Sequence, residues 1–401
     1  MSNVSFHKSG LKLILDKNDS PIVSCRLMVN VGSTNEDDTN KGVSHFLEHM
    51  VFNGTTTKSK EDILYKIPAS GADQNAYTTF DHTVYMVNGT NSNFELCLDT
   101  LCDMVVNPSL DEGQIQKEIN VVLQELGDAK NNPQSVAYGM FYGNIFQGEE
   151  IRTDILGTEE SIKNFTSEKT REYHQKYYIP SNMVLSISGN YDETILNNII
   201  EKYFLDLNLK ESTLIIHKPR KQDLIKIQND FNQDQVMFCY HYNWYDKLTV
   251  ELMNHILGNG MDSILFRIIR EEKGLVYSIY SYDGKIHDSK FVGITALCES
   301  DKTDEIISLV PTVARKTYLI AEDELQAGKN KLMFSYAERF ANSSNNADNN
   351  LNDYMCDGRM LSYDEIKKEV DKISISSFAN VARGILSQNP LIVASVAKSK
   401  N

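Results

Sequence analysis

Hydrophobic residues recur along the chain with two spacings, alternating in some stretches and helical in others. Two apolar-rich runs at 11–15 and 22–31 are separated by a polar, turn-like cluster at 16–21, which predicts a pair of adjacent strands. Two further strands are expected around 70–79 and 83–87. The start of the chain is therefore predicted to form a sheet.

Helical spacing dominates the segments between these strands. We expect a helix that carries His45, capped by Thr39 or Asn40 and ended by Asn53 and Gly54. Further helices are expected at 61–67, 93–106, 110–129, 159–163, 167–178 and 192–204. The asparagine-rich segment 342–353 resembles a loop in composition, but its apolar residues keep helical spacing and favour a helix.

The second half of the sequence repeats the order of elements of the first half. Strands are predicted at 236–242, 277–282, 291–298 and 391–396, and helices between them at 248–257, 264–272, 303–318, 322–340 and 363–373. A charged segment with little periodicity, 210–222, is the candidate linker. The sequence thus predicts a first domain at 1–209 and a second domain at 223–401.

Three polar side chains interrupt the apolar run from Gly42 to Gly54. In a helix, His45 and His49 lie one turn apart on one face, with Glu48 beside them. The order His-x-x-Glu-His lets two imidazoles hold zinc while the glutamate transfers protons. The alternative is a pair of packed core histidines with a surface glutamate. The apolar flanks favour a zinc site, because buried imidazole and carboxylate groups need partners.

The predicted helix at 110–129 places two glutamates on its apolar stripe. Glu118 and Glu125 occupy positions where aliphatic residues are expected, and a zinc ion would compensate the charge of one of them. Alternatively, Val121 and Leu123 define a different buried face and both acids are solvated. The second half has no His-x-x-Glu-His, so we expect His255 to be a packed or surface residue and only one half to bind metal.

Composition narrows the class of protein further. With 40 Lys and Arg against 55 Asp and Glu, the net charge is −15, which argues against nucleic-acid binding. No apolar run reaches transmembrane length, and 1–16 lacks the apolar core of a signal peptide, so we expect a cytoplasmic protein, or one of an organelle matrix, without membrane contact. The six scattered cysteines predict reduced core residues.

Three groups of residues together point to a known family. They are His45-Phe46-Leu47-Glu48-His49, the acids Glu118 and Glu125, and the pair Arg270 and Tyr277. This set resembles the pitrilysin family of inverted zinc peptidases, which includes insulysin and the mitochondrial processing peptidases. The resemblance implies an α+β fold of two homologous domains, each a mostly antiparallel sheet with helices packed on one face.

The resemblance also implies roles for individual residues. Glu125 would be the third zinc ligand and Glu118 the carboxylate that supports the site, a choice that periodicity alone leaves open. The segment 70–78 is similar to an edge strand that binds extended peptide, which makes Asn75, Ala76 and Tyr77 the expected substrate contacts.

The second domain contributes a further pair of residues in such peptidases. By resemblance, Arg270 and Tyr277 would reach the substrate near the metal. Chains of this kind pair around a closed chamber, so we expect a homodimer or a dimer with a related subunit.

The expected function is that of a zinc endopeptidase for unfolded peptides or precursor segments. One Zn²⁺ per chain would keep its fourth position for water, and Glu48 would act as the general base, while Arg270 and Tyr277 stabilise the oxyanion. Two alternatives are a non-catalytic subunit of a respiratory complex, in which the zinc residues are typically lost, and a peptide-binding module without cleavage.

Overall fold

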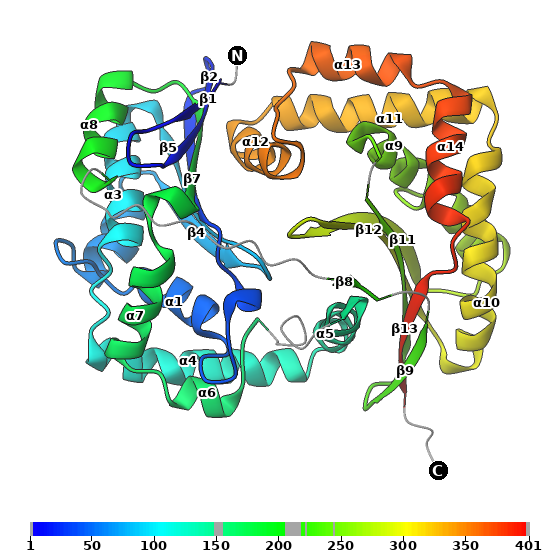
Figure 1. The fold of residues 1–401 in the computed structure, drawn as a ribbon, viewed down its shortest axis with the longest axis horizontal. Coiled ribbons are helices and arrows are strands. Elements are labelled where there is room, and N and C mark those ends of the chain that lie inside the picture. Colours follow the sequence, from blue (N-terminus) through cyan, green and yellow to red (C-terminus); the bar gives the residue numbers. More distant parts are fainter. Residues whose placement is uncertain (1–2, 148–154, 205–217, 221–222, 244, 398–401) are drawn as a thin grey trace. The chain divides into compact units, whose positions relative to one another are not determined.

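The computed structural model describes residues 3–147, 155–204, 218–220, 223–243 and 245–397. Backbone contacts divide the chain into two compact units, each built from separate stretches of sequence (Figure 1). The first unit comprises Met1–Asp128, Thr153–Leu214 and Glu338–Ser362. The second unit comprises Ala129–Arg152, Ile215–Ala337 and Tyr363–Asn401.

The first unit contains a six-stranded sheet. In spatial order its strands are β1 (Asn3–Phe6), β2 (Lys12–Lys17), β7 (Met183–Gly189), β3 (Ile22–Val29), β5 (Thr83–Thr90) and β4 (Asp73–Thr78). The runs at 11–15 and 22–31 do form strands, but the prediction that they are adjacent is wrong. β7 lies between them, parallel to β2 and antiparallel to β3. Because β7 is buried along its whole length, its backbone N–H and C=O groups need a hydrogen-bonded strand on each side.

Helices of the first unit enclose a hydrophobic core on one face of this sheet. They are α1 (Val43–Val51), α2 (Ile67–Ala69), α3 (Phe94–Val106), α4 (Glu112–Lys130), α6 (Glu159–Lys163), α7 (Ser167–Tyr177) and α8 (Glu193–Phe204). Leu27 and Val29 of β3 face this core together with Phe46 and Leu47 of α1. The apolar side of α1 thereby anchors the helix that carries His45.

The second unit contains a five-stranded sheet of related topology. In spatial order its strands are β11 (Ser278–Ile286), β12 (Ser289–Cys298), β10 (Asp234–Tyr242), β13 (Leu391–Ala397) and β9 (Leu224–Asn229). Its helices are α5 (Pro133–Ile145), α9 (Lys247–Leu257), α10 (Thr303–Ala314), α11 (Glu322–Phe340), α13 (Tyr363–Lys372) and α14 (Ile375–Leu386). The parallel pair β9 and β13 corresponds to β2 and β7. The predicted α+β fold, with two mostly antiparallel sheets, is confirmed.

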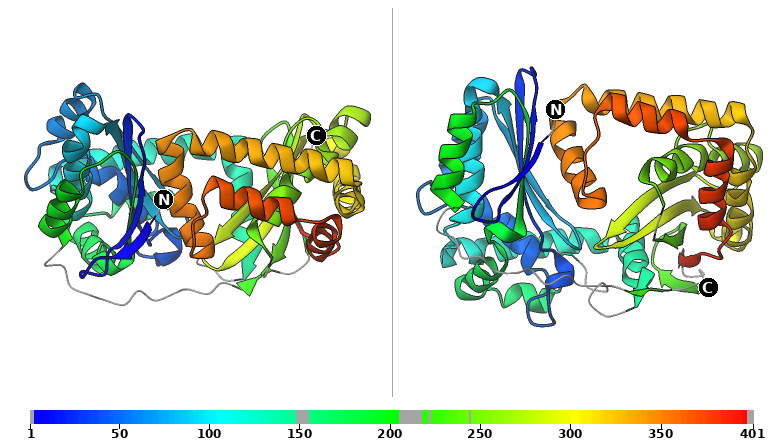
Figure 2. Two further views of the ribbon diagram at one scale, coloured as in Figure 1. Left: turned by 90° about the horizontal axis from the view of Figure 1, so that it is seen from above. Right: turned by 45° about the horizontal axis from the view of Figure 1, so that its top comes forward.

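Each sheet also contacts a helix from the other half of the sequence. α12 (Ser343–Asp357) packs on β3 and β7, and α5 packs on β10 and β13. Figure 2 shows α12, in orange, beside the six-stranded sheet in both views. The asparagine-rich segment is therefore helical, as its spacing predicts. The domains expected from the sequence are continuous, 1–209 and 223–401. They place α12 in the second domain and α5 in the first, unlike the two units described above.

Arg26 of β3 makes several polar contacts with α12. Its side chain is only 1% exposed. Nε donates to Asp348 Oδ1 at 2.6 Å, and the two terminal nitrogens donate to Asn88 Oδ1 at 2.8 Å and Ser344 Oγ at 2.7 Å. Leu351 of α12 packs beside this network in a small apolar cluster. The buried charge therefore fixes the position of α12 on the sheet.

Replacing Arg26 with leucine is expected to destabilise the first unit. The change takes the donors of three hydrogen bonds away from Asp348, Asn88 and Ser344, a loss on the order of 3 kcal/mol, although the Asp348 carboxylate is partly solvated. Urea unfolding measures the difference. The control Arg171→Leu removes an exposed arginine of the same unit, which donates to the Ser109 carbonyl, and should cost less than about 1 kcal/mol. Equal losses in both variants would contradict this role of Arg26.

Three further predictions concern the linker, membrane-spanning helices and the cysteines. The expected linker, 210–222, falls largely outside the described residues, although Lys218–Pro219 form β8, which pairs with β6 (Phe146–Gln147). Among the helices described, none combines the length and apolar character needed to cross a membrane. The cysteines described as free are all buried, as predicted: Cys25, Cys97, Cys102, Cys239 and Cys298.

Candidate metal centre

The start of α1 is held by a buried carboxylate. Gly42, the N-cap residue, has φ 84°, and a Cβ there would lie 2.6 Å from a backbone carbonyl oxygen, so the position favours glycine. Glu36 accepts hydrogen bonds from the N–H groups of Gly42 at 2.6 Å and Ser44 at 2.9 Å. The prediction that Thr39 or Asn40 caps this helix is therefore wrong. The Glu36 carboxylate satisfies the first turn instead.

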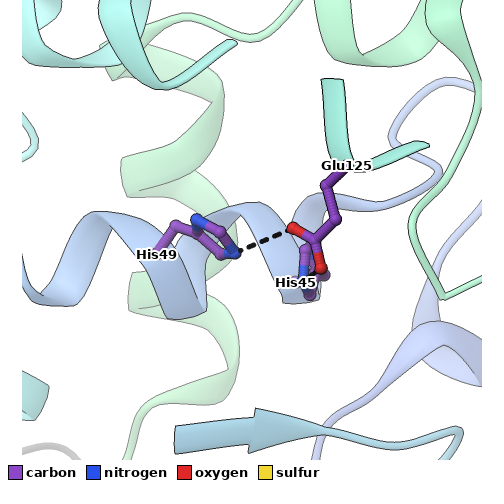
Figure 3. Close-up of side chains that lie close together, drawn as sticks. All are labelled: His45, His49 and Glu125. Carbon is purple, nitrogen blue, oxygen red and sulfur yellow. Dashed lines mark ion pairs between the residues drawn. The ribbon is translucent and has the colours of Figure 1, made fainter. Parts of the chain in front are cut away.

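His45 and His49 of α1 face Glu125 of α4 (Figure 3). His45 Nε2 lies 3.7 Å from Glu125 Oε1, and His49 Nε2 lies 3.5 Å from Glu125 Oε2. One candidate ligand atom from each residue lies within 4.8 Å of the other two. His45 is buried, whereas the Glu125 side chain is 46% exposed. The cluster therefore has a side from which solvent can approach.

The spacing of these atoms fits a zinc ion. Two ligands that each bind zinc at about 2.0–2.1 Å in tetrahedral geometry are about 3.4 Å apart. Each imidazole nitrogen lies at a similar distance from one of the two Glu125 oxygens. Burial and the neighbouring His49 lower the pKa of His45 to about 4, so its ring is neutral at pH 7. Burial also lowers the pKa of His49, but hydrogen bonds to Glu118 and Glu125 outweigh it and raise that pKa to about 9. The two carboxylates thus favour a positive charge at this point.

Glu118 lies behind His49 and orients its ring. Glu118 Oε1 accepts a hydrogen bond from His49 Nδ1 at 2.9 Å, which leaves His49 Nε2 directed at Glu125. Glu118 is 9% exposed, whereas Val121 is 50% exposed. The alternative in which Val121 helps to define the buried face of this helix is therefore wrong. The stripe that contains Glu118 is the one that packs on the core.

Glu48 lies beside the two histidines but outside the group of candidate ligands. Its Oε2 accepts a hydrogen bond from Thr78 Oγ1 of β4 at 2.6 Å. Burial raises the pKa of Glu48, and this hydrogen bond acts in the opposite direction. Thr78 therefore holds the Glu48 side chain next to the candidate metal position. The sequence pattern did not reveal this role of Thr78.

The predicted substrate contacts lie on β4, at one edge of the six-stranded sheet. Asn75, Ala76 and Tyr77 pair with Met86, Tyr85 and Val84 of β5. Side chains alternate along the strand, so that Ala76 packs on the core beneath α1 and Tyr77 packs on the cluster beneath α12. Within the described sheet, β5 is the neighbour of β4 on one side, and the other side is an edge.

Arg270 and Tyr277 belong to the second unit. Arg270 lies in a short π-helix, Phe266–Glu272, with its guanidinium 4.8 Å from the centre of the Phe266 ring. Tyr277 precedes β11, is 48% exposed and donates a hydrogen bond to Glu299 Oε1 at 2.9 Å. Their expected contact with substrate stays a prediction.

Comparisons with known proteins identify the family of this chain. A sequence model of the insulinase peptidases, family M16, matches residues 12–159, and a model of the M16 inactive domain matches residues 164–332. A Rickettsia bellii protein described as an uncharacterized zinc protease is 30% identical over 397 residues, which cover 96% of this chain and 95% of that protein. The chain belongs to peptidase family M16. It is a metallopeptidase, and the family resemblance drawn from the site residues is confirmed.

Another relative and two solved structures are similar to this chain over nearly its whole length. The zinc protease YmxG of Bacillus subtilis is 26% identical over 396 residues, covering 95% of each protein. A protease from Helicobacter pylori, of known structure, superposes with a TM-score of 0.87 at 20% identity and 99% coverage of both chains. An M16 inactive domain from Pseudomonas fluorescens gives a TM-score of 0.88 at 19% identity, covering 99% of this chain and 98% of that one. These structures support the two-domain M16 fold.

Proposed function

We propose that this M16 protein is a zinc endopeptidase that hydrolyses unfolded peptides or precursor segments, with one zinc ion per chain. The observation that carries the proposal is the convergence of His45 Nε2, His49 Nε2 and the Glu125 carboxylate, with the Glu48 carboxylate beside them. Three protein ligands with a solvent-accessible side are typical of a catalytic zinc site, whereas a structural site is closed by four.

The residues around the site have distinct tasks in peptide hydrolysis. A zinc ion held by His45, His49 and Glu125 would supply a Lewis acid that polarises the attacking water and the scissile carbonyl. Glu48 accepts a proton from the attacking water while the oxygen of that water bonds to the scissile carbonyl carbon. Glu48 then donates that proton to the leaving amine as the C–N bond breaks.

The edge strand β4 supplies the means to hold an extended peptide. A substrate strand added beside β4 would form main-chain hydrogen bonds with the segment that includes Asn75, Ala76 and Tyr77. The next residue of the strand, Thr78, bonds to Glu48. The strand that holds the peptide and the base that acts on it are therefore directly connected.

Arg270 and Tyr277 would assist from the second unit. A guanidinium and a phenol are donors suited to an oxyanion that develops on the scissile carbonyl. The Tyr277 hydroxyl donates to a carboxylate oxygen of Glu299, a negatively charged acceptor like the proposed oxyanion. We include both residues in the proposal as stabilisers of the transition state.

Cleavage of a mixed library of unfolded peptides tests this proposal. Mass spectrometry should find internal cleavage products with the purified protein, none after treatment with a metal chelator, and the same products again after zinc is restored. Peptide binding without chelator-sensitive cleavage would support a binding module instead. Absence of zinc from the purified and zinc-treated protein would support a non-catalytic subunit.

Replacing Thr78 with valine is expected to lower kcat without changing zinc content. Valine keeps the shape of the side chain and removes the hydroxyl that holds Glu48, so the base loses its orientation while the ligands stay in place. The expected loss is about tenfold, the value of one neutral-to-charged hydrogen bond of about 1.5 kcal/mol. Steady-state kinetics on a fluorogenic peptide measure it. An unchanged kcat would show that Thr78 does not position the base.

We further propose that the chain forms a homodimer, because the metal ligands and the Arg270 and Tyr277 pair occur in one chain. Light scattering of the purified protein should give twice the mass of 45.5 kDa. The mass of a monomer at the concentration of the activity assay would contradict this part of the proposal.

A further inference from the structure

Asn53 connects the supporting carboxylate of the metal site to the end of the helix that carries the histidines. His45, His49 and Asn53 follow one another at intervals of four residues, so they lie along one side of α1 and its C-terminal end. Asn53 is buried. Its Nδ2 donates to Glu118 Oε2 at 3.0 Å and to the backbone carbonyl of His49 at 3.1 Å.

Lys60 fixes the orientation of this amide. Its Nζ donates to Asn53 Oδ1 at 2.5 Å. If the amide were turned by 180°, its oxygen would face the Glu118 carboxylate and its NH₂ group would face the ammonium group. Both contacts would then be repulsive. The lysine therefore directs the NH₂ group of Asn53 at Glu118.

Glu118 uses its two carboxylate oxygens for different partners. Oε1 faces His49 Nδ1 at 2.9 Å, and Oε2 faces Asn53. Loss of the Asn53 contact would leave a buried oxygen without this donor and allow the carboxylate to rotate away from His49. A carboxylate that accepts from the far N–H of a metal-binding histidine fixes the tautomer and the orientation of the ring.

We propose that Asn53 and Lys60 are positioning residues that hold Glu118 against His49 and thereby set the affinity of the site for zinc. The inference rests on the proposed function only in requiring that His45, His49 and Glu125 bind zinc. It does not require that the protein cleave any particular peptide.

The test compares zinc binding by full-length variants. Asn53→Leu keeps the branched shape of the side chain and removes its donor and acceptor. We expect zinc dissociation constants up to about tenfold higher than in the unchanged protein, the lower end of the range for loss of a histidine's direct partner, because Asn53 acts through Glu118. Competition with a chromophoric chelator measures them after metal removal. Lys60→Met should weaken binding in the same direction by a smaller factor, because Asn53 remains but is no longer oriented.

Two variants on the exposed side of α4 serve as matched controls. Asn120→Leu and Lys117→Met also remove an amide and an ammonium group, but from exposed residues close to Glu118 in sequence. Both should bind zinc as the unchanged protein does. Thermal unfolding of the metal-free proteins identifies any variant that does not fold. If Asn53→Leu does not fold, the zinc affinity of Lys60→Met tests the inference instead.

A second readout reports the ring of His49 directly. In the unchanged metal-free protein, ¹⁵N chemical shifts of labelled histidine should show His49 Nδ1 protonated, and in Asn53→Leu the signals should shift toward a mixture of ring states. Zinc affinities and shifts equal to those of Asn120→Leu would overturn the inference while leaving the proposed function intact. Tight zinc binding without peptide cleavage in the unchanged protein would instead contradict the proposed function alone.

Discussion

The variant Glu48→Gln is expected to bind zinc and peptide but to cleave about 10²–10⁴-fold more slowly than the unchanged protein. Glutamine has the size of glutamate and can still accept the hydrogen bond from Thr78. It cannot take up the proton that the attacking water must lose, nor deliver one to the leaving amine. Because Glu48 lies outside the ligand group, the metal site keeps its three ligands.

Measurements of kcat, zinc content and peptide affinity on one preparation test this prediction. The control Glu160→Gln changes an exposed glutamate of α6 and should leave all three values unchanged. If Glu48→Gln retained full turnover, another group would have to act as the base. If it lost zinc together with activity, Glu48 would have to be counted as a ligand.

Glu125→Gln is expected to lose zinc affinity more severely than Glu118→Gln. Glu125 is the acid whose oxygens lie 3.5 and 3.7 Å from the two imidazole nitrogens, so its replacement removes a direct ligand. Glu118 acts through His49, and the loss of such a partner typically weakens metal binding about 10–100-fold. The change at Glu125 should exceed that range, and peptide cleavage should fall with it.

Isothermal titration of the metal-free variants with zinc distinguishes the two acids. The sequence alone left their roles open, since both lie on the same stripe of α4, so this comparison tests the geometric assignment itself. A larger loss in Glu118→Gln than in Glu125→Gln would reverse their roles. Glu112→Gln, an exposed change on the same helix, provides the baseline.

Local sequence patterns were sufficient to propose the metal site. The His-x-x-Glu-His spacing placed two imidazoles on one turn, and the helical stripe identified Glu118 and Glu125 as acids that needed compensation. Glu36 and Thr78 could not be found in this way. Glu36 lies in the polar loop 6 residues before Gly42, and Thr78 lies in a strand 30 residues after Glu48. A glutamate in a polar loop or a threonine in a strand carries no distinguishing pattern.

The limits of the fold prediction have a similar cause. Periodicity located most strands and helices, including α12, because it reports which side of an element is buried. It could not show that β7 inserts between β2 and β3, since that pairing joins segments more than 150 residues apart. Nor could it show that Arg26 would find its partner Asp348 on α12, from the other half of the chain.

Zinc titration of the metal-free protein, with hydrolysis of an unfolded peptide followed in parallel, tests the central claim most directly. The account predicts no cleavage without zinc, activity that rises in proportion to added zinc, and a plateau at one equivalent per chain. Cleavage that persists without metal, or a protein that binds one equivalent of zinc and cleaves no unfolded peptide, would contradict it.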